Sequence, residues 1–134
     1  MDRTGARAAA MKLIYEWEMG GDGGEETRQD LLEIKPDEKE RDYMEQLFAG
    51  VREHAADIDA EVSKYAVGWK IERISRVDLA IMRVAIYEIK YASQPAGVAV
   101  NEALELARAY STPEAVPFVN GVLGTISRKL AANA

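Results

Sequence analysis

The sequence predicts an all-α protein of about seven helices. Apolar residues recur at intervals of three and four through most of the 134-residue chain, and no segment shows the alternating pattern of a β-strand. The breaks between these segments contain glycine, proline or helix-capping residues, and they leave helices and loops of ordinary length. With 48% hydrophobic residues the chain can bury one sizeable core, so we expect a single domain over residues 1–134.

The first helix is expected over residues 2–19. Arg3 and Arg7 lie one turn apart on one face, where they would form a basic surface. The residues at core-facing spacing are Ala6, Ala10, Leu13, Ile14 and Trp17. Four glycines within residues 20–24 should end the helix, because glycine loses the most backbone freedom on ordering.

Three further helices are expected between residues 27 and 65. Thr27 and Asp30 indicate a short capped helix that ends at Glu33. Asp37 and Glu40 form the capping-box pair of a longer helix, which should pack on the central helix described below. Its apolar stripe is Met44, Leu47, Phe48, Val51 and Ala55. The third helix carries Ile58, Val62 and Tyr65.

The segment of residues 72–91 is predicted to be the central helix. Apolar side chains cover most of its surface, so other helices must surround it. The exception is a narrow stripe of Arg76, Arg83 and Lys90, spaced seven residues apart. This stripe is either a solvated face or the partner of the acidic segment described below.

A capping box marks the start of this central helix. Ser75 stands three residues before Asp78, so the serine hydroxyl should accept a hydrogen bond from the Asp78 amide. The Asp78 carboxylate should in turn accept one from the Ser75 amide.

Two helices are expected after a break at residues 93–97. The first should bury one face, formed by Val100, Ala103, Leu104, Ala107 and Tyr110, and point Glu102, Glu105 and Arg108 away from the core. Thr112 and Pro113 signal a new start, but Pro117 cannot donate to the Pro113 carbonyl. We therefore expect one isolated turn and a last helix from Pro117. Its inward residues are Phe118, Val119, Val122, Leu123, Ile126 and Leu130.

The net charge of −6 is unevenly distributed. Residues 22–61 carry fourteen acidic and five basic residues, so the rest of the chain is positive overall. Local basic faces outside this acidic segment therefore remain compatible with nucleic acid, because charges are screened beyond about 10 Å at ordinary salt. The chain has no cysteine, no signal peptide pattern and no membrane-spanning run, which predicts a cytoplasmic protein.

Motifs for catalysis are absent from the sequence. His54 is the only histidine and has no serine or cysteine nucleophile signature near it, so we expect it at the surface or at a helix C-terminus. The sequence also lacks metal-binding and dinucleotide-binding patterns. We expect no catalytic residue, no metal and no cofactor.

An interaction surface is the remaining functional prediction. Arg3 and Arg7 at one end and Arg128 with Lys129 at the other are basic groups with Tyr15 and Phe118 as candidate aromatic neighbours. Cations on a rigid scaffold beside aromatic rings suit single-stranded RNA. On periodicity alone, ordinary solvated charges and core-edge aromatics are the favoured interpretation.

Three stretches change this balance because they match one family in order and spacing. They are RAAAMKLIYEW (residues 7–17), VDLAIMRVAIYE (77–88), and VAVNEALELARAY (98–110) followed by FVNGV (118–122). Together they strongly resemble the NusB family of transcription antitermination factors. The N-terminal part of certain ribosomal-RNA cytosine methyltransferases is also similar. The chain ends at Ala134 without room for a cofactor domain, so the stand-alone factor is the better match.

The resemblance implies two small helical bundles packed across each other and a non-catalytic function. The family binds boxA RNA together with NusE, a ribosomal protein, so that RNA polymerase resists termination during ribosomal-RNA transcription. Its RNA contacts carry over to Arg3, Arg7, Lys12, Tyr15, Phe118 and Asn120, and its NusE-facing surface to Asp78. Homodimers are also plausible in this family.

One departure from the family and one alternative function remain. The family's N-terminal run of arginines is reduced here to Arg3 and Arg7, so we expect weak affinity for RNA alone and a larger contribution from the partner. The alternative is a protein-binding helical adaptor without intrinsic RNA affinity, whose acidic residues 22–61 dock a basic partner.

Overall fold

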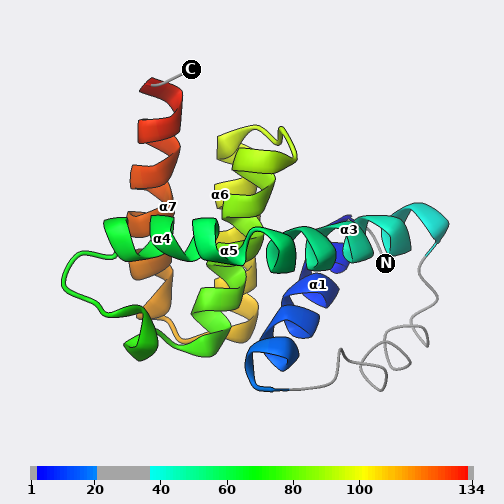
Figure 1. The fold of residues 1–134 in the computed structure, drawn as a ribbon, viewed down its shortest axis with the longest axis horizontal. Helices are drawn as coiled ribbons and strands as arrows, with labels where there is room; N and C mark the ends of the chain where they lie inside the picture. Colours follow the sequence, from blue (N-terminus) through cyan, green and yellow to red (C-terminus); the bar gives the residue numbers. More distant parts are fainter. Residues whose placement is uncertain (1–2, 21–36, 133–134) are drawn as a thin grey trace.

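A computed structural model describes residues 3–20 and 37–132, and this part of the chain is helical with no strand (Figure 1). The predicted all-α class is therefore confirmed. The elements are α1 (Arg3–Glu18), α3 (Glu38–Glu53), α4 (Ala55–Tyr65), the 3₁₀ helix η1 (Ile71–Arg73), α5 (Arg76–Tyr91), α6 (Ala96–Tyr110) and α7 (Ala115–Ala132). The short helix predicted from Thr27 to Glu33, and the glycines after Gly20, lie outside the described residues. None of the described helices is long and apolar enough to cross a bilayer.

Helix α5 is the centre of the fold, as its composition predicts. It contacts each of the other described α-helices, and its residues from Asp78 to Glu88 are all buried. Helices α1 and α3 pack together on one side of α5, α6 and α7 on the other, and α4 packs against α5 and α7 (Figure 1). These two groups form the two packed bundles that the family resemblance implies.

The start of α5 differs from the prediction by four residues. Ser75 is the N-cap, and its hydroxyl accepts from the Asp78 amide at 3.3 Å, as expected. Residues Ile74 and Ser75 have extended backbone, so the helix begins at Arg76, and Glu72 belongs to η1. The Asp78 carboxylate does not complete the capping box. It accepts from the Ser111 hydroxyl at 2.6 Å, a partner that only the tertiary fold brings near.

Helix α3 begins as predicted and approaches α5 closely. The Asp37 carboxylate accepts from the Glu40 amide at 2.8 Å, which caps the first turn. Four of the predicted stripe residues are buried: Met44, Leu47, Phe48 and Val51. Gly50 faces the ring of Tyr87 on α5, and a Cβ at this glycine would lie 2.2 Å from the ring atom Cε2. The absent side chain therefore sets how near the two helices come.

Two predictions for α6 are wrong. Its buried residues are Ala99, Ala103, Leu106 and Ala107, whereas Tyr110 is 44% exposed. Glu102 does not point away: its carboxylate accepts from the Thr4 hydroxyl of α1 at 3.1 Å. Thr4 and Arg7 of α1 lie close to Glu102, a tertiary contact that helical periodicity cannot reveal.

Helix α7 begins at Ala115, two residues before the predicted start. Pro117 occupies its third position, where a backbone N–H would have no partner within the helix. The proline therefore breaks no hydrogen bond. The expected turn is present at Pro113 and Glu114, where the Ala115 amide donates to the Thr112 carbonyl at 3.0 Å, and α7 follows it directly. The predicted inner face is correct for Val119, Val122, Leu123 and Ile126, which are buried.

Candidate functional site

A cleft beside the C-terminal half of α1 brings together two of the predicted RNA-binding residues, Lys12 and Tyr15. Its volume is about 470 Å³, and its lining residues are Met11, Lys12, Tyr15, Glu16, Met19, Val77 and Tyr110. The Lys12 ammonium lies 4.9 Å from the centre of the Tyr110 ring. We call this the α1–α6 cleft. It presents one cation beside two exposed tyrosine rings.

A second cleft brings together the predicted partner residue Asp78 and the predicted RNA-binding residue Phe118. Its volume is about 420 Å³, and it is lined by Trp69, Arg73, Ile74, Ser75, Asp78, Thr112, Glu114, Ala115 and Phe118. Trp69 is 53% exposed, and its ring centre lies 5.6 Å from that of Phe118 at an angle of 58°. We call this the η1–α7 cleft. Trp69 is its largest exposed side chain.

The two clefts adjoin at the start of α5. Val77 lines the first and the next residue, Asp78, lines the second. Likewise Tyr110 and Thr112 line different clefts, and between them Ser111 donates its hydroxyl to Asp78. This hydrogen bond explains why Asp78 is only 7% exposed although it lines a cleft. Four predicted site residues thus lie in two clefts whose linings include neighbouring residues at the start of α5.

Arg7 lines neither cleft. Its side chain is 4% exposed, and its Nε donates to both Glu88 carboxylate oxygens at 3.0 Å. The Tyr43 hydroxyl donates to the same carboxylate. Helix α1 turns Arg7 toward α5 and α3, so the predicted basic face shared by Arg3 and Arg7 is wrong. Arg7 is a buried ion-pair residue in this structure.

The electrostatics of this buried cluster favour the charged form of Arg7 and the neutral form of Tyr43. Burial, the largest single effect, would lower the pKa of Arg7, but the charge of Glu88, its hydrogen bond and the neighbouring Tyr43 and Glu102 together outweigh burial, so the pKa is raised. Burial and the hydrogen bond to Glu88 raise the pKa of Tyr43 to about 12. The tyrosine therefore stays a neutral hydrogen-bond donor throughout the physiological range.

Arg3 and Asn120 are exposed but lie apart from the two clefts. The Arg3 guanidinium stands 4.2 Å from the centre of the Tyr43 ring. At 1.5 Å per residue along α1, Arg3 is roughly 14 Å from Lys12. Asn120 is exposed on α7 and does not line the η1–α7 cleft with Phe118. The structure therefore divides the predicted RNA-binding residues among several places.

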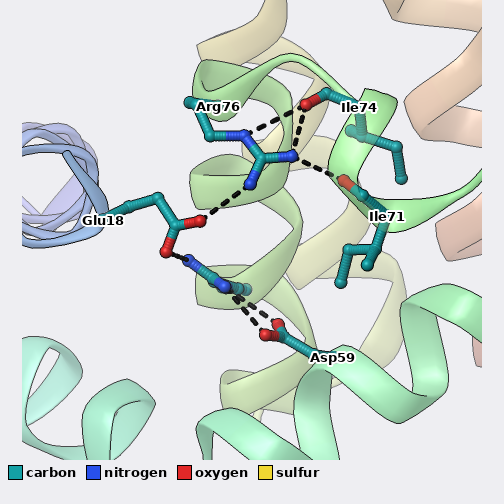
Figure 2. Close-up of polar contacts among 6 residues, drawn as sticks. Glu18, Asp59, Ile71, Ile74 and Arg76 are labelled. Atoms are coloured by element: carbon teal, nitrogen blue, oxygen red, sulfur yellow. Dashed lines mark hydrogen bonds and ion pairs between the residues drawn. The ribbon is translucent and has the colours of Figure 1, made fainter.

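An ionic network, part of which is drawn in Figure 2, shows whether the basic stripe of α5 is solvated or paired with acidic residues. The Glu18 carboxylate, at the end of α1, accepts from Arg76 at 2.7 Å and from Arg83 at 3.1 Å. Arg83 also donates twice to Asp59 of α4, at 2.8 Å each. Lys90 pairs with Glu61 at 3.4 Å. The stripe is thus paired with acids rather than solvated, and Asp59 and Glu61 belong to the acidic segment.

Glu18 is held as a carboxylate by this network. Burial would raise its pKa, but the hydrogen bonds and charges of Arg83 and Arg76 outweigh burial and lower the pKa below its ordinary value. In Figure 2 the Arg76 guanidinium also points to the carbonyl oxygens of Ile71 and Ile74. Sequence reasoning overlooked both Glu18 and Trp69. Only for Trp69 was there a signal, a large aromatic directly after the turn glycine Gly68.

His54 and possible metal-binding side chains are the remaining candidates for catalysis or metal binding. His54 is the C-cap residue of α3, as predicted, and its ring stacks on Tyr91 with centres 3.8 Å apart. In the part of the chain that the structure describes, no group of three histidine, cysteine or acidic side chains is arranged to hold a metal ion.

Comparison with known proteins gives one consistent result. The model of the NusB family matches residues 4–128. The transcription antitermination protein NusB of Acetivibrio thermocellus is 44% identical over 128 residues, which cover 94% of this chain and 88% of that protein. The solved structure of Thermotoga maritima NusB has a TM-score of 0.84, with 29% identity, 96% of this chain and 92% of that chain covered.

A solved complex is also similar. It contains the antitermination factors NusB and NusE with double-stranded RNA, and the matching chain has a TM-score of 0.82 at 26% identity. The match covers 95% of this chain and 96% of that chain.

Proposed function

This chain belongs to the NusB family, and on that basis we propose that it is a non-catalytic antitermination factor that binds boxA RNA together with NusE. In this role it would help RNA polymerase to continue through ribosomal-RNA genes. The observation that supports the proposal is a pair of clefts whose linings include the consecutive residues Val77 and Asp78, with Lys12 and Tyr15 in one cleft and Asp78 and Phe118 in the other. The similar complex of NusB, NusE and RNA supports the pairing of these two partners.

The α1–α6 cleft has the groups that single-stranded RNA requires. The Lys12 ammonium can neutralise a phosphate, and the half-exposed ring of Tyr15 can stack on an unpaired base. Arg3 and Asn120 are exposed and remain proposed contacts at the margins of the RNA path. Arg7 takes a different role, because its charge is already satisfied by Glu88 inside the protein.

The η1–α7 cleft suits a mixed contact. Glu114 offers an exposed carboxylate to a basic protein partner, the largely buried Asp78 adds negative charge to the lining, and Trp69 and Phe118 offer aromatic surface. A protein with a net charge of −6 attracts RNA weakly at long range, so a basic partner such as NusE would supply much of the phosphate attraction. A homodimer stays a prediction.

A binding assay with boxA RNA, with and without NusE, tests the proposal. Lys12→Ala should lower the affinity and flatten the dependence of log K on log salt by about 0.7, the value for one contact to single-stranded RNA. Lys64→Ala is the matched control, because its ammonium also lies over a tyrosine ring, that of Tyr65, at 5.3 Å. It should leave the affinity and the slope unchanged.

Two results would overturn this function. One is the absence of sequence-selective RNA binding by the wild-type protein even when NusE is present. The other is an equal effect of the two lysine substitutions, which would mean that the α1–α6 cleft has no special role. Binding of NusE without any RNA selectivity would instead favour the protein-binding adaptor.

A further inference from the structure

We propose that Arg76 is a positioning residue of this interface, which holds the η1 wall of the η1–α7 cleft in place relative to α1. The proposal rests on the proposed function, because it concerns how the surface that binds RNA and NusE keeps its shape. Arg76 lines neither cleft itself. It acts through the residues that do.

The Arg76 guanidinium joins three separate groups (Figure 2). Its Nη2 donates to the Ile71 carbonyl at 2.5 Å and to the Ile74 carbonyl at 2.7 Å, and Nε donates to Ile74 at 3.2 Å. Its Nη1 donates to Glu18 at 2.7 Å. This arrangement uses the flat, forked shape of arginine, whose donors point in fixed directions. The single ammonium of lysine cannot reproduce all of these bonds at once.

Apart from Arg76, the segment is fixed by a few local backbone hydrogen bonds and by the packing of Ile71 and Ile74 against the core. It begins after Gly68, which has φ of +83°, and contains a 3₁₀ helix of only three residues. The hydrogen bonds of such a short helix are poorer than those of an α-helix. Ile74 is buried, but Trp69 is largely exposed and Ile71 only half-buried. The bonds from Arg76 add the link that ties this wall to Glu18 of α1.

Glu18, the residue of α1 that Arg76 binds, is itself held in a fixed position. Arg83 is 5% exposed and fixed by its paired bonds to Asp59, and it also binds the second oxygen of Glu18. Glu18 is the last residue of α1, one turn after Tyr15, and its neighbour Met19 lines the α1–α6 cleft. Through Glu18, Arg76 fixes the wall that carries Trp69 against the helix that carries Lys12 and Tyr15.

This arrangement predicts that binding and stability respond differently to loss of Arg76. The side chain is 26% exposed and lies outside the apolar core, so its removal should leave the fold intact. The wall would then sample several positions, and the partner would have to order it on binding. Affinity should fall much more than thermal stability.

The test measures the affinity for boxA RNA in the presence of purified NusE. Arg76→Gln and Arg76→Lys should each weaken binding by about tenfold, with a melting temperature close to that of the wild type. Equal effects of the two substitutions would identify the fork, rather than the charge, as the essential feature. The control is Arg108→Gln, which removes an exposed ion pair with Glu105 and should change the affinity by less than about twofold.

A double-mutant cycle separates positioning from a general structural effect. Trp69→Ala alone should weaken binding, and Arg76→Gln should add less than about twofold in that background, because the residue through which it acts is gone. In protein labelled with 5-fluorotryptophan, the ¹⁹F resonance of Trp69 should shift or broaden in Arg76→Gln and stay unchanged in Arg108→Gln. Trp17→Phe assigns the two resonances.

The outcomes distinguish this proposal from the proposed function. If the wild-type protein shows no sequence-selective RNA binding even with NusE present, the proposed function fails. If the wild type binds but the Arg76 variants bind equally well, only the positioning role fails. Strictly additive effects of the Arg76 and Trp69 substitutions, or an unaltered affinity of Trp69→Ala, would also overturn the positioning role.

Discussion

Helix α1 is fixed by ion pairs at both of its ends, but the two ends differ in their exposure to solvent. Near the N-terminal end, the side chains of Arg7 and Glu88 are 4% and 1% exposed. At the C-terminal end, Glu18 and Arg76 are about one-quarter exposed, and only Arg83 is deeply buried. We call the buried Arg7–Glu88 pair the dry anchor of α1, and the partly exposed network of Glu18, Arg76 and Arg83 its wet anchor.

This difference in solvent exposure determines what each anchor can contribute to the structure. Removal of a charge from water is costly, so a buried pair tolerates no loss of either partner but fixes one geometry. A partly exposed pair is weakened by solvent and contributes little to stability. The dry anchor therefore suits the core contact of α1, α3 and α5. The wet anchor lies behind the candidate interface, where a modest energy is enough to hold a wall.

Loss of the Glu88 charge should break the dry anchor. Among the residues that the structure describes, Glu88→Gln leaves the buried Arg7 cation with Glu102, 3.6 Å from its Nη1, as the one compensating charge. We expect the free energy of unfolding to fall by about 3 kcal/mol, measured by urea denaturation.

A double substitution provides the control for this effect. Arg7→Met with Glu88→Leu removes both charges and should recover most of the loss, because no buried charge is then left alone. A loss of less than about 1 kcal/mol in the single variant would show that Glu102 alone compensates the charge of Arg7. The dry anchor would then contribute no more to stability than an exposed ion pair.

The packing of α3 against α5, beside the dry anchor, can be disrupted without any change of charge. Gly50→Ala would place a Cβ 2.2 to 2.6 Å from ring atoms of Tyr87, so α3 must move away from α5. We expect a loss of about 1 to 3 kcal/mol in the free energy of unfolding. Tyr43, on α3, would also be drawn away from Glu88.

Gly121→Ala is the matched control for Gly50→Ala. Gly121 is also a helical glycine, but an added Cβ there would meet no atom within 4 Å. It should stabilise the protein by about 0.5 to 1 kcal/mol through helix propensity. Equal effects at the two glycines would show that the close approach of α3 and α5 is not a constraint.

The helices and their inner faces could be predicted from the sequence because both depend on local patterns. The stripe of α3 and the caps at Asp37 and Ser75 are defined within a few residues of one another, and the structure confirms them. The start of the last helix was misjudged by two residues because the prediction began it at Pro117, whereas a proline at the third position of α7 costs no hydrogen bond.

The partners of charged residues could not be predicted in this way. Arg7 and Arg3 are equivalent in sequence pattern, yet one is buried against Glu88 and the other is exposed. Glu88 is 81 positions away from Arg7, so only the packing of α1 on α5 decides the difference. The same holds for Glu18, whose partners Arg76 and Arg83 lie on another helix.

The contribution of the wet anchor to the free energy of unfolding should depend on pH. Glu18→Gln removes the carboxylate that Arg76 and Arg83 share, and we expect a loss of about 0.5 kcal/mol near neutral pH, reduced by solvent screening. Because the pKa of Glu18 is lower in the folded state than its ordinary value of 4.5, this contribution is present above that pH. It is lost as the pH falls through the folded-state pKa.

Urea denaturation of the wild type and Glu18→Gln between pH 3 and 7 measures this directly. The difference in stability should be constant above about pH 5 and shrink toward zero in more acidic solution. Glu105→Gln, which removes an exposed pair with Arg108, should cost less than about 0.5 kcal/mol near neutral pH. A difference for Glu18 that matched the dry anchor in size would contradict the contrast, because the network would then carry the fold rather than only the wall of the cleft.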